Sequence, residues 1–329
     1  MDLDYRLVKS VRDETEKGLQ PENDGSRLTY TAVSDDTGLS VRKVLKRRLG
    51  FSSRLLARLK RGEGFVKRNG VAVRLFADVL EGDIINVVLP EEKSRFIPED
   101  IPVSVVYSDE DIMIIDKQPF VVVHPTHDHL TGSLANGLMK KMLDENDNYK
   151  IRFVNRLDRD TSGLVVVARN SHCQDAMIKA MKSGRVEKRY LAVVHGNIAE
   201  ESGTIDLPIG RPSPDDVRRG VMEGGSPSVT HYCVKERYDV PAGKFTLLEL
   251  LLETGRTHQI RVHLSHIGFP IVGDPLYGKE EPELIGRQAL HAFSLRFSHP
   301  VTGAEIDVNA PPAQDIVELL KKIENSCHA

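Results

Sequence analysis

The chain has 329 residues, which exceeds the length at which one hydrophobic core usually stops growing, so we expect two domains, or one large domain with an appendage. Charged residues make up 28% of the chain and the net charge is only −3, which by itself neither indicates nor excludes a polyanionic partner. The cysteines Cys173, Cys233 and Cys327 form no C-x-x-C pair, which argues against a disulfide framework. No stretch approaches the ~20 apolar residues of a membrane span, so we expect a cytoplasmic protein with no membrane partner.

The N-terminal third of the sequence predicts a small unit preceded by a tail. Residues 1–26 mix charged residues with Gly, Pro and Asn and show little periodicity, so they are expected to form a tail without an assigned function. Two short helices follow at 40–50 and 52–62, each with a serine as its cap and a glycine at its end. Asn69-Gly70 then predicts a two-residue hairpin turn, and 78–88, with a turn at Gly82-Asp83, is expected to close the unit with a further strand.

This small unit, 27–90, is strongly basic. Between residues 42 and 74 twelve Lys and Arg residues accompany a single acid, Glu63, so the window carries +11 and the rest of the chain −14. Phosphate contacts by such residues supply most of the sequence-independent affinity for nucleic acid. A solvated helix face without a partner is the alternative, and the imbalance of charge favours nucleic acid. The residues expected to contact RNA are Arg42, Lys43, Arg54, Arg58, Lys60, Lys67 and Arg68.

Residues 91–102 contain several prolines and mixed charge, which predicts a linker to a second domain at 103–329. That domain begins with an expected hairpin at 103–116 and a helix capped by Ser133. Further along, 171–182 is predicted to be a helix and 186–194 a strand. After a buried strand at 245–252, Thr257 is placed to cap another helix, on which Ile260, Leu264 and Ile267 face the core.

Two motifs that suggest ligands are weak. His124, His127 and His129 lie close together, but no helical spacing, cysteine or suitable carboxylate completes a metal site, so no metal is expected. The Gly-rich segment 220–228 lacks the strand-loop-helix frame and the ending of a phosphate-binding loop. The sequence therefore predicts no nucleotide site and no cofactor.

The stretch 151–170 has two apolar ends that read as strands around a loop of charged and small residues. Asp158 lies two residues from both Arg156 and Asp160, so an extended chain would place all three on one face, where the arginine could keep a carboxylate charged. Such a carboxylate could act as a nucleophile or a base. A solvated hairpin tip explains the same residues, and both interpretations stay open at this point.

Two other segments carry side chains that could face this loop. Tyr190 on the strand 186–194 is either a core residue or a ring on which a base could stack. His258 and Ser265 flank the apolar stripe of the helix after Thr257, so that a polar helix face could line a cleft; an exposed flank is the alternative.

Six motifs occur in a fixed order over the second domain: HPT at 124–126, RLDRDTSGLVVVARN at 156–170, KRYLAVV at 188–194, TGRTHQIRVHL at 254–264, IVGDPLYG at 271–278 and LHAFSLRFSHP at 290–300. With them, the region from about 103 to the C-terminus resembles the catalytic domain of the RluA-type pseudouridine synthases. Residues 39–89 resemble an S4 RNA-binding domain. The combination resembles the branch of the family that modifies large-subunit ribosomal RNA.

The resemblance implies an α+β protein in which an S4-like domain precedes a mixed, mainly antiparallel sheet with a central cleft. It implies isomerisation of uridine in RNA by base flipping and an aspartate, without a cofactor or an obligate protein partner. Asp158 would be the catalytic aspartate, Arg261 its partner, Tyr190 the residue that stacks on the target base and Arg156 the side chain that fills the vacated stack. Further expected substrate-binding residues are Arg159, Thr161, His124, Arg256 and His258.

The sequence departs from the family at Asn155, where His is usual, and at 225–228, where a lysine commonly follows the glycine. Two other functions stay open beside the enzyme. One is a non-catalytic RNA-binding or ribosome-assembly factor, which the basic window supports. The other is a glycosidase-like hydrolase that would use Asp158 and Asp160 as paired carboxylates.

Overall fold

The structure is a computed structural model that describes residues 27–90, 92–125, 130–213, 215–241 and 243–326. The predictions for the tail at 1–26, for His127 and His129, and for Cys327 lie outside these residues. Cys173 and Cys233 are free thiols. No helix in the described ranges is both long and apolar enough to cross a membrane.

The N-terminal module, residues 27–90, has two helices beside a four-stranded antiparallel sheet of order β1-β4-β2-β3. Its elements are β1 Arg27–Thr31, the 3-10 helix η1 Ser34–Asp36, α2 Val41–Arg47, α3 Ser53–Lys60, β2 Phe65–Arg68, β3 Val71–Ala72 and β4 Ile84–Val88. The expected serine caps are confirmed, since Ser40 accepts a hydrogen bond from the amide of Lys43 and Ser52 from that of Leu55. The hairpin turn is also confirmed, with positive φ at Asn69 and Gly70.

The turn at Gly82-Asp83 that the sequence predicts within 78–88 is confirmed, and the strand that follows it is β4, Ile84–Val88. The turn at Gly82 and Asp83 precedes it, and the carboxylate of Asp83 accepts hydrogen bonds from the amide of Leu80 and the side chain of Asn69. These local hydrogen bonds hold the segment before β4 as a turn.

The second part of the chain is built on a ten-stranded sheet, whose main path is β10-β13-β14-β9-β15-β8-β6-β5. Every pairing is antiparallel except β15 with β8, so the sheet is mixed and mainly antiparallel, as expected. Its strands are β5 Ser104–Ser108, β6 Ile112–Lys117, β7 Arg152–Phe153, β8 Ser162–Ala168, β9 Glu187–His195, β10 Ser202–Asp206, β13 Val229–Val240, β14 Gly243–Leu252, β15 Leu290–Ser298 and β16 Glu305–Asn309. A separate pair consists of β11 Ile209–Gly210 and β12 Gly220–Val221.

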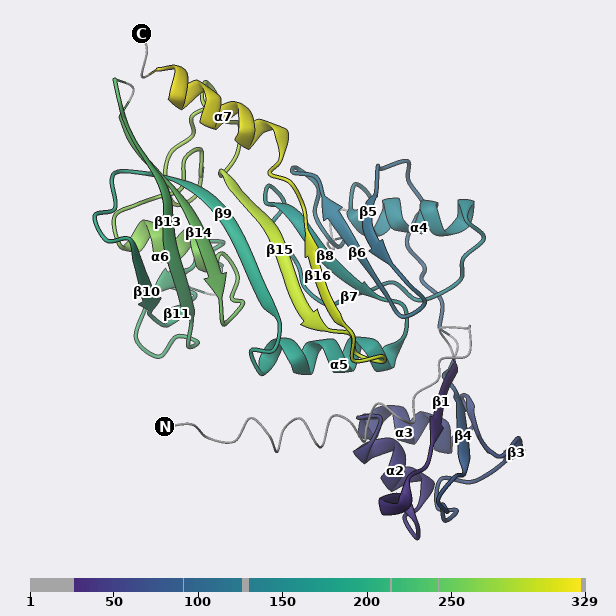
Figure 1. Cartoon of the computed structure of the whole chain (residues 1–329). Coiled ribbons are helices and arrows are strands. Elements are labelled where there is room, and N and C mark those ends of the chain that lie inside the picture. The colour runs from purple at the N-terminus through teal and green to yellow at the C-terminus, as the bar shows by residue number, and fades with distance from the viewer. Residues whose placement is uncertain (1–26, 91, 126–129, 214, 242, 327–329) are drawn as a thin grey trace, which may run out of the picture.

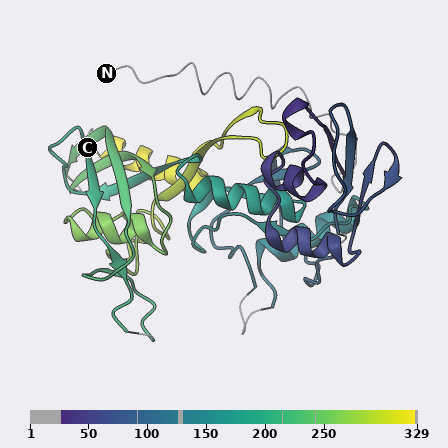
Figure 2. The same cartoon turned by 90° about the horizontal axis from the view of Figure 1, so that it is seen from below.

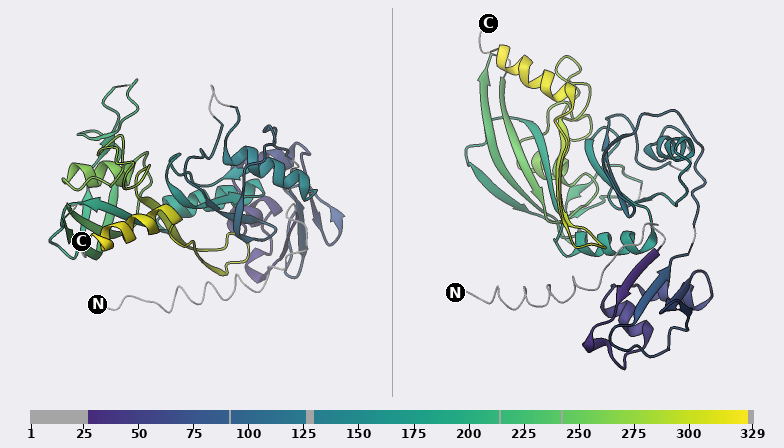
Figure 3. Two further views of the ribbon diagram at one scale, coloured as in Figure 1. Left: turned by 90° about the horizontal axis from the view of Figure 1, so that it is seen from above. Right: turned by 45° about the vertical axis from the view of Figure 1, so that its right-hand side comes forward.

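Four helices surround this sheet: α4 Leu134–Asp144, α5 Ser171–Lys182, α6 Gln259–His266 and α7 Gln314–Asn325. In Figure 1, α4 and α7 lie at opposite ends of the sheet and α5 crosses its lower end, next to the N-terminal module. The view from above shows α6 and α7 on opposite sides of the strands (Figure 3, left). The serine cap of α4 is confirmed, because Ser133 accepts a hydrogen bond from the amide of Asn136.

The N-terminal module is packed onto α5 (Figure 2). One hydrophobic cluster includes the module core and the face of the large sheet formed by residues such as Ile114 and Val166. At the contact, the rings of Phe51 and His172 lie 4.8 Å apart, and the ammonium of Lys179 donates a hydrogen bond of 3.1 Å to the carbonyl of Gly50. The domain boundaries at 26, 90 and 102 stay predictions.

The parallel pairing of β15 with β8 depends on a glycine. Gly163 lies opposite Ala292 with a φ of +111°, and a Cβ atom at this position would lie 2.2 Å from the carbonyl oxygen of Ala292. A larger residue would force the two strands apart. This contact fixes the start of β8, directly after the charged loop at 156–161.

We expect Gly163→Ala to lower the free energy of unfolding by about 2–5 kcal/mol, because it adds a backbone clash to an unfavourable φ. Gly184→Ala is the matched control: its φ is +69° with no atom within 4 Å of the added Cβ, so a cost of about 1 kcal/mol is expected. Urea unfolding of both variants measures the difference. Equal losses would show that the close approach to Ala292 does not matter.

Candidate active site

The loop 156–161 connects β7 to β8 and is held by its own backbone. The amide of Thr161 donates a hydrogen bond to the carbonyl of Asp158, which closes a turn. The chain is therefore not extended from Asp158 to Thr161, so Asp160 does not share a face with Arg156 and Asp158, which line one cavity. The carboxylate of Asp160 pairs instead with the exposed guanidinium of Arg159, at 2.8 Å.

Two fully buried cations from other parts of the sequence hold this loop. The ammonium of Lys117, at the end of β6, donates to the carbonyl of Arg159 at 3.0 Å, and burial lowers the pKa of this lysine to about 7. The guanidinium of Arg287 donates to the carbonyl of Asp160 at 2.9 Å and forms two hydrogen bonds with Asp315 at the start of α7. The backbone of the loop is thus fixed from both sides.

The side chain of Asp158 faces α6, where it meets Arg261. Nη1 of Arg261 donates to Oδ2 of Asp158 at 3.0 Å, whereas its Nε and Nη2 atoms both donate to Asp274 at 2.8 Å. Arg261 and Asp274 are buried, and the side chain of Asp158 is 26% exposed. One guanidinium therefore binds two carboxylates, a buried one with two hydrogen bonds and a partly exposed one with a single hydrogen bond.

The surroundings of Arg261 keep this group charged. Burial opposes its charge, but hydrogen bonds and charges from Asp274 and Asp158 raise the pKa of Arg261 above its ordinary value. Burial would likewise raise the pKa of Asp274, yet Arg261 and the amides of Leu276 and Tyr277 lower it overall. The guanidinium also lies 5.2 Å from the centre of the Tyr277 ring. Arg261 is therefore held by Asp274 and the ring of Tyr277, and its Nη1 is directed at Asp158.

The start of α6 differs from the prediction. His258, rather than Thr257, precedes the first helical residue; its φ is +60° and no side chain caps the helix. The hydroxyl of Thr257 instead accepts a hydrogen bond of 2.7 Å from Nη2 of Arg156. The left-handed backbone at His258 aims its ring at Tyr277, at 2.9 Å from Nδ1 to Oη, with Nε2 at 3.9 Å from Asp158. Burial lowers the pKa of His258, against the opposing charge of Asp158.

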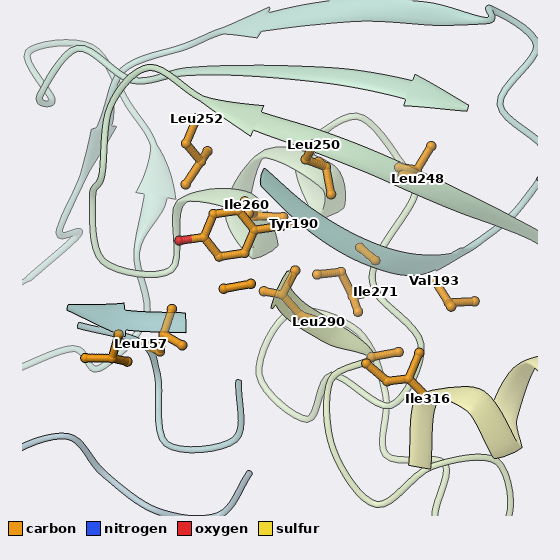
Figure 4. Close-up of a cluster of buried hydrophobic side chains, with 14 of the residues drawn as sticks. Leu157, Tyr190, Val193, Leu248, Leu250, Leu252, Ile260, Ile271, Leu290 and Ile316 are labelled. Carbon is orange, nitrogen blue, oxygen red and sulfur yellow. The ribbon is translucent and has the colours of Figure 1, made fainter. Parts of the chain in front are cut away.

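Tyr190 lies on β9, on the same buried face as Ala192 and Val194, as the strand pattern predicts. Its ring packs among apolar side chains, including Leu157, Leu252 and Leu290, and its phenol oxygen points out of the cluster (Figure 4). Burial raises the pKa of Tyr190, and the charge of Asp158 raises it further. The phenol is therefore neutral, and the ring forms an apolar wall beside the carboxylate.

These side chains enclose a cavity of about 60 Å³, which we call the Asp158 cavity. It has room for a few waters, since each needs ~10–15 Å³. Apolar walls come from Leu157, Leu252, Ile260 and Leu290, and Gln259 also lines it. Seven of the nine residues predicted for the site line it: Arg156, Asp158, Thr161, Tyr190, Arg256, His258 and Arg261.

The other two predicted residues lie elsewhere. The guanidinium of Arg159 is exposed and paired with Asp160, outside the cavity. His124 lines a second cavity, between the module and α5, where its ring meets the edge of Phe153 at 4.7 Å. Within the described residues no group of three or more His, Cys, Asp or Glu side chains could hold a metal ion.

The basic residues predicted to contact RNA fall into two groups. Arg42, Lys43, Arg54, Lys60 and Lys67 are exposed on the module. The side chain of Arg58 is only 16% exposed and pairs with Glu63 and Glu92, so it is part of an internal ion network. Arg68 is half-buried and lies 3.8 Å from Asp83. Five of the seven residues predicted to contact RNA are therefore exposed and accessible to a partner.

Several residues important to the geometry were missed by the sequence reasoning. Asp274 lies in the segment 271–278. This segment resembles the family pattern, but the resemblance gave no role for the carboxylate of Asp274. The local sequence does not indicate the roles of Lys117, Tyr277 and Arg287, because the hydrogen-bond partners that matter here lie far away in the sequence. Asn155, where the family usually has His, accepts a hydrogen bond from the amide of Val166 and donates to the carbonyl of Leu164, so it binds the backbone of β8.

Comparison with known proteins shows the family of this chain. The sequence model of a family described as RNA pseudouridylate synthase matches residues 111–266. The chain is 42% identical to the uncharacterized RNA pseudouridine synthase YjbO of Bacillus subtilis, over 83% of this chain and 95% of the relative. It is 41% identical to the ribosomal large subunit pseudouridine synthase D of Escherichia coli K12, over 70% of this chain and 73% of the relative.

Among solved structures, the human RNA pseudouridylate synthase domain containing 1 aligns with a TM-score of 0.54 and 29% identity, over 69% of this chain and 96% of that one. The alignments with the two bacterial relatives extend over more than two thirds of the chain. The protein therefore belongs to the RluA-type family of RNA pseudouridine synthases.

Proposed function

We propose that this RNA pseudouridine synthase modifies uridine in large-subunit ribosomal RNA and that Asp158 is its catalytic carboxylate. The observation that carries the proposal is the position of Asp158, which is held by Arg261 at the wall of a cavity shared with Tyr190, Arg156 and His258. The substrate class is supported by relatives named ribosomal large subunit pseudouridine synthase D, at 39–41% identity. The cytoplasmic location stays a prediction.

The reaction requires little besides a positioned carboxylate. The bond between N1 of uracil and C1′ of the ribose breaks, a bond from C5 to C1′ forms, C5 loses a proton and N1 gains one. The balance is an isomerisation, so neither a redox partner nor a group donor is consumed. A carboxylate held beside Arg261 can attack the nucleoside or accept a proton, and a cavity with little water strengthens its interaction with the reacting atoms.

The cavity can receive a uracil only after the base leaves the RNA stack, which costs a few kcal/mol. In our proposal, the ring of Tyr190 is the platform on which the extruded base stacks, a contact worth ~1–3 kcal/mol. Arg156, exposed at the mouth and hydrogen-bonded to Thr257, would then occupy the space that the base leaves in the RNA. Thr161, Arg256 and His258 would complete the walls around the base and its ribose.

The arrangement of the site gives less support to the two alternative functions. A glycosidase-like pair needs a second carboxylate facing the same bond, but Asp160 is turned toward Arg159 and does not line the cavity. A purely RNA-binding factor would have no need for the buried arrangement of Arg261, Asp274 and Asp158. We propose that the N-terminal module is an S4-like domain and that its exposed cations contribute affinity for RNA rather than chemistry.

Asp158→Asn should reduce pseudouridine formation in a ribosomal RNA transcript by at least about 1,000-fold, because the acting charge is lost while the shape is kept. Asp160→Asn is the matched control, since its carboxylate faces Arg159, and it should retain activity within a few-fold. Pseudouridine mapping of the transcript after incubation measures both. Full activity of Asp158→Asn would exclude Asp158 as the catalyst.

Asp274→Asn should lower the free energy of unfolding by about 3–5 kcal/mol near pH 7, because it leaves Arg261 without its buried counter-charge. The pKa of Asp274 is lowered in the folded protein, so its contribution is present above the unfolded value of ~3.9 and is lost as the pH falls through the lower folded value. The difference between wild type and variant, followed by urea unfolding, should therefore shrink below about pH 4.

The control for this change is Asp239→Asn, since Asp239 is 69% exposed and pairs with Lys244 at the surface, at 3.1 Å. A loss within about 1 kcal/mol is expected there. If Asp274 positions Arg261, its loss should also lower kcat by roughly tenfold or more at an unchanged KM. Equal behaviour of the two Asn variants would contradict the role of the buried pair.

Charge reversal of Arg42 and Lys43 together should weaken binding of the transcript and lower the slope of log K against log salt by about 0.7 for each lost contact with a single strand. Arg58 is unsuitable for this test because of its ion pairs with Glu63 and Glu92. The double variant Lys244→Glu/Lys321→Glu makes the same change in net charge outside the module. If RNA binding by the two double variants depended on salt in the same way, the module would not be part of the RNA-binding surface.

A further inference from the structure

A second cavity lies at the seam between the N-terminal module and the catalytic domain. Its volume is about 270 Å³, and we call it the seam cavity. One wall is formed by α3 of the module, and the opposite walls come from residues 150–153 and the first turns of α5. The close neighbourhood of the module and α5 is visible in Figures 1 and 3. None of the residues that surround it belongs to the Asp158 cavity.

The lining of the seam cavity is positively charged. Four cations, Arg54, Arg58, Lys150 and Arg152, line it together with two carboxylates, so two positive charges are in surplus. Glu92 binds three of these cations: it forms a hydrogen bond with Arg152 and ion pairs with Arg58 at 3.1 Å and Lys150 at 3.5 Å. The site therefore attracts an anion without leaving its inner cations unpaired.

The cations at the rim are available to a ligand. Arg54 is exposed and forms no hydrogen bond or ion pair with the residues that the structure describes. The side chain of Lys150 is 48% exposed and is held only by the longer contact with Glu92. Ser171 and Gln174 of α5 add polar groups between them. An anion in the cavity would thus meet two exposed cations, Arg54 and Lys150, beside the inner cations that Glu92 already binds.

One residue from each cavity relates the two sites electrostatically. His124 lines the seam cavity, and Arg156 lines the Asp158 cavity. The two side chains are close enough that the charge of Arg156 helps burial to lower the pKa of His124. The two cavities therefore lie within electrostatic range of each other.

We propose that the seam cavity binds a backbone phosphate of the RNA strand that runs from the extruded uridine toward the module. The inference rests on the proposed function, because it requires RNA at the Asp158 cavity. The volume lies just below the ~300–1,000 Å³ of pockets for drug-sized ligands, which suits a phosphate with its ribose. Because the module is fixed to α5 by Phe51 and Lys179, both walls are in place before RNA binds.

The test uses Arg54→Glu/Lys150→Glu in the full chain, with Lys244→Glu/Lys321→Glu as a control of equal charge. For a ribosomal RNA transcript that wild type modifies, we expect the seam variant to raise KM roughly tenfold at an unchanged kcat. The slope of the logarithm of the RNA-binding constant against the logarithm of the salt concentration should become shallower by about 0.7, as expected for the loss of one phosphate contact. Both variants should unfold within a few degrees of the wild-type temperature, because the altered side chains are exposed and each variant loses one ion pair, that of Lys150 with Glu92 or that of Lys244 with Asp239.

A second measurement locates the phosphate and does not depend on the folding of a variant. Single uncharged methylphosphonate groups are placed along the RNA on either side of the modified uridine. One position should weaken binding of wild type but leave the seam variant unchanged.

The two measurements distinguish failure of the phosphate site from failure of the proposed function. If no single position affects wild type, or if the seam variant behaves like its control, the seam cavity binds no phosphate, while pseudouridine formation by wild type still supports the proposed function. If wild type modifies no uridine in any ribosomal RNA transcript, the proposed function fails first.

Discussion

The arrangement around Asp158 depends on one buried guanidinium that binds two carboxylates. A charged arginine in the interior is costly unless its donors are satisfied, and Asp274 satisfies two of them with a bidentate pair. Of the remaining N–H groups, one on Nη1 is directed at Asp158. The buried pair thus converts a flexible side chain into a fixed donor, so the position of Asp158 is decided by a residue that does not line the cavity.

The backbone under Asp158 is fixed in a similar way. Lys117 and Arg287 are both fully buried, and they bind the carbonyls of two consecutive residues in the loop. Arg287 also pairs with Asp315, so the C-terminal helix α7 is connected to the loop through one side chain. The site therefore draws on β6, β8, α6 and the segment before β15, and these elements together hold the charged loop in place.

Much of this fold could be predicted from local patterns. Serine caps, glycine stops and the Asn69-Gly70 turn identify the elements of the module, because each of these signals acts within a few residues. The order of the motifs, together with family resemblance, gave seven residues that share one cavity.

Long-range contacts explain what could not be predicted. The partner of Asp158 is Arg261, 103 positions away, and no alternation of residues in the loop could indicate it without the family pattern. The start of α6 was misplaced because a threonine next to a helix usually caps it, whereas here its hydroxyl binds Arg156 and the backbone at His258 turns left-handed. Arg58 was predicted to be a surface cation, but it forms an ion pair with Glu92, which lies in the predicted linker.

The central claim is that Arg261 holds Asp158 in the position from which it acts on uridine. The most direct measurement is the release of tritium from C5 of uridine-labelled ribosomal RNA by wild type and Arg261→Gln, with RNA binding measured in parallel. The account predicts that release falls by about 100-fold or more while RNA affinity stays within a few-fold, because only the geometry of the carboxylate is lost. Release at the wild-type rate by a folded Arg261→Gln protein would contradict it.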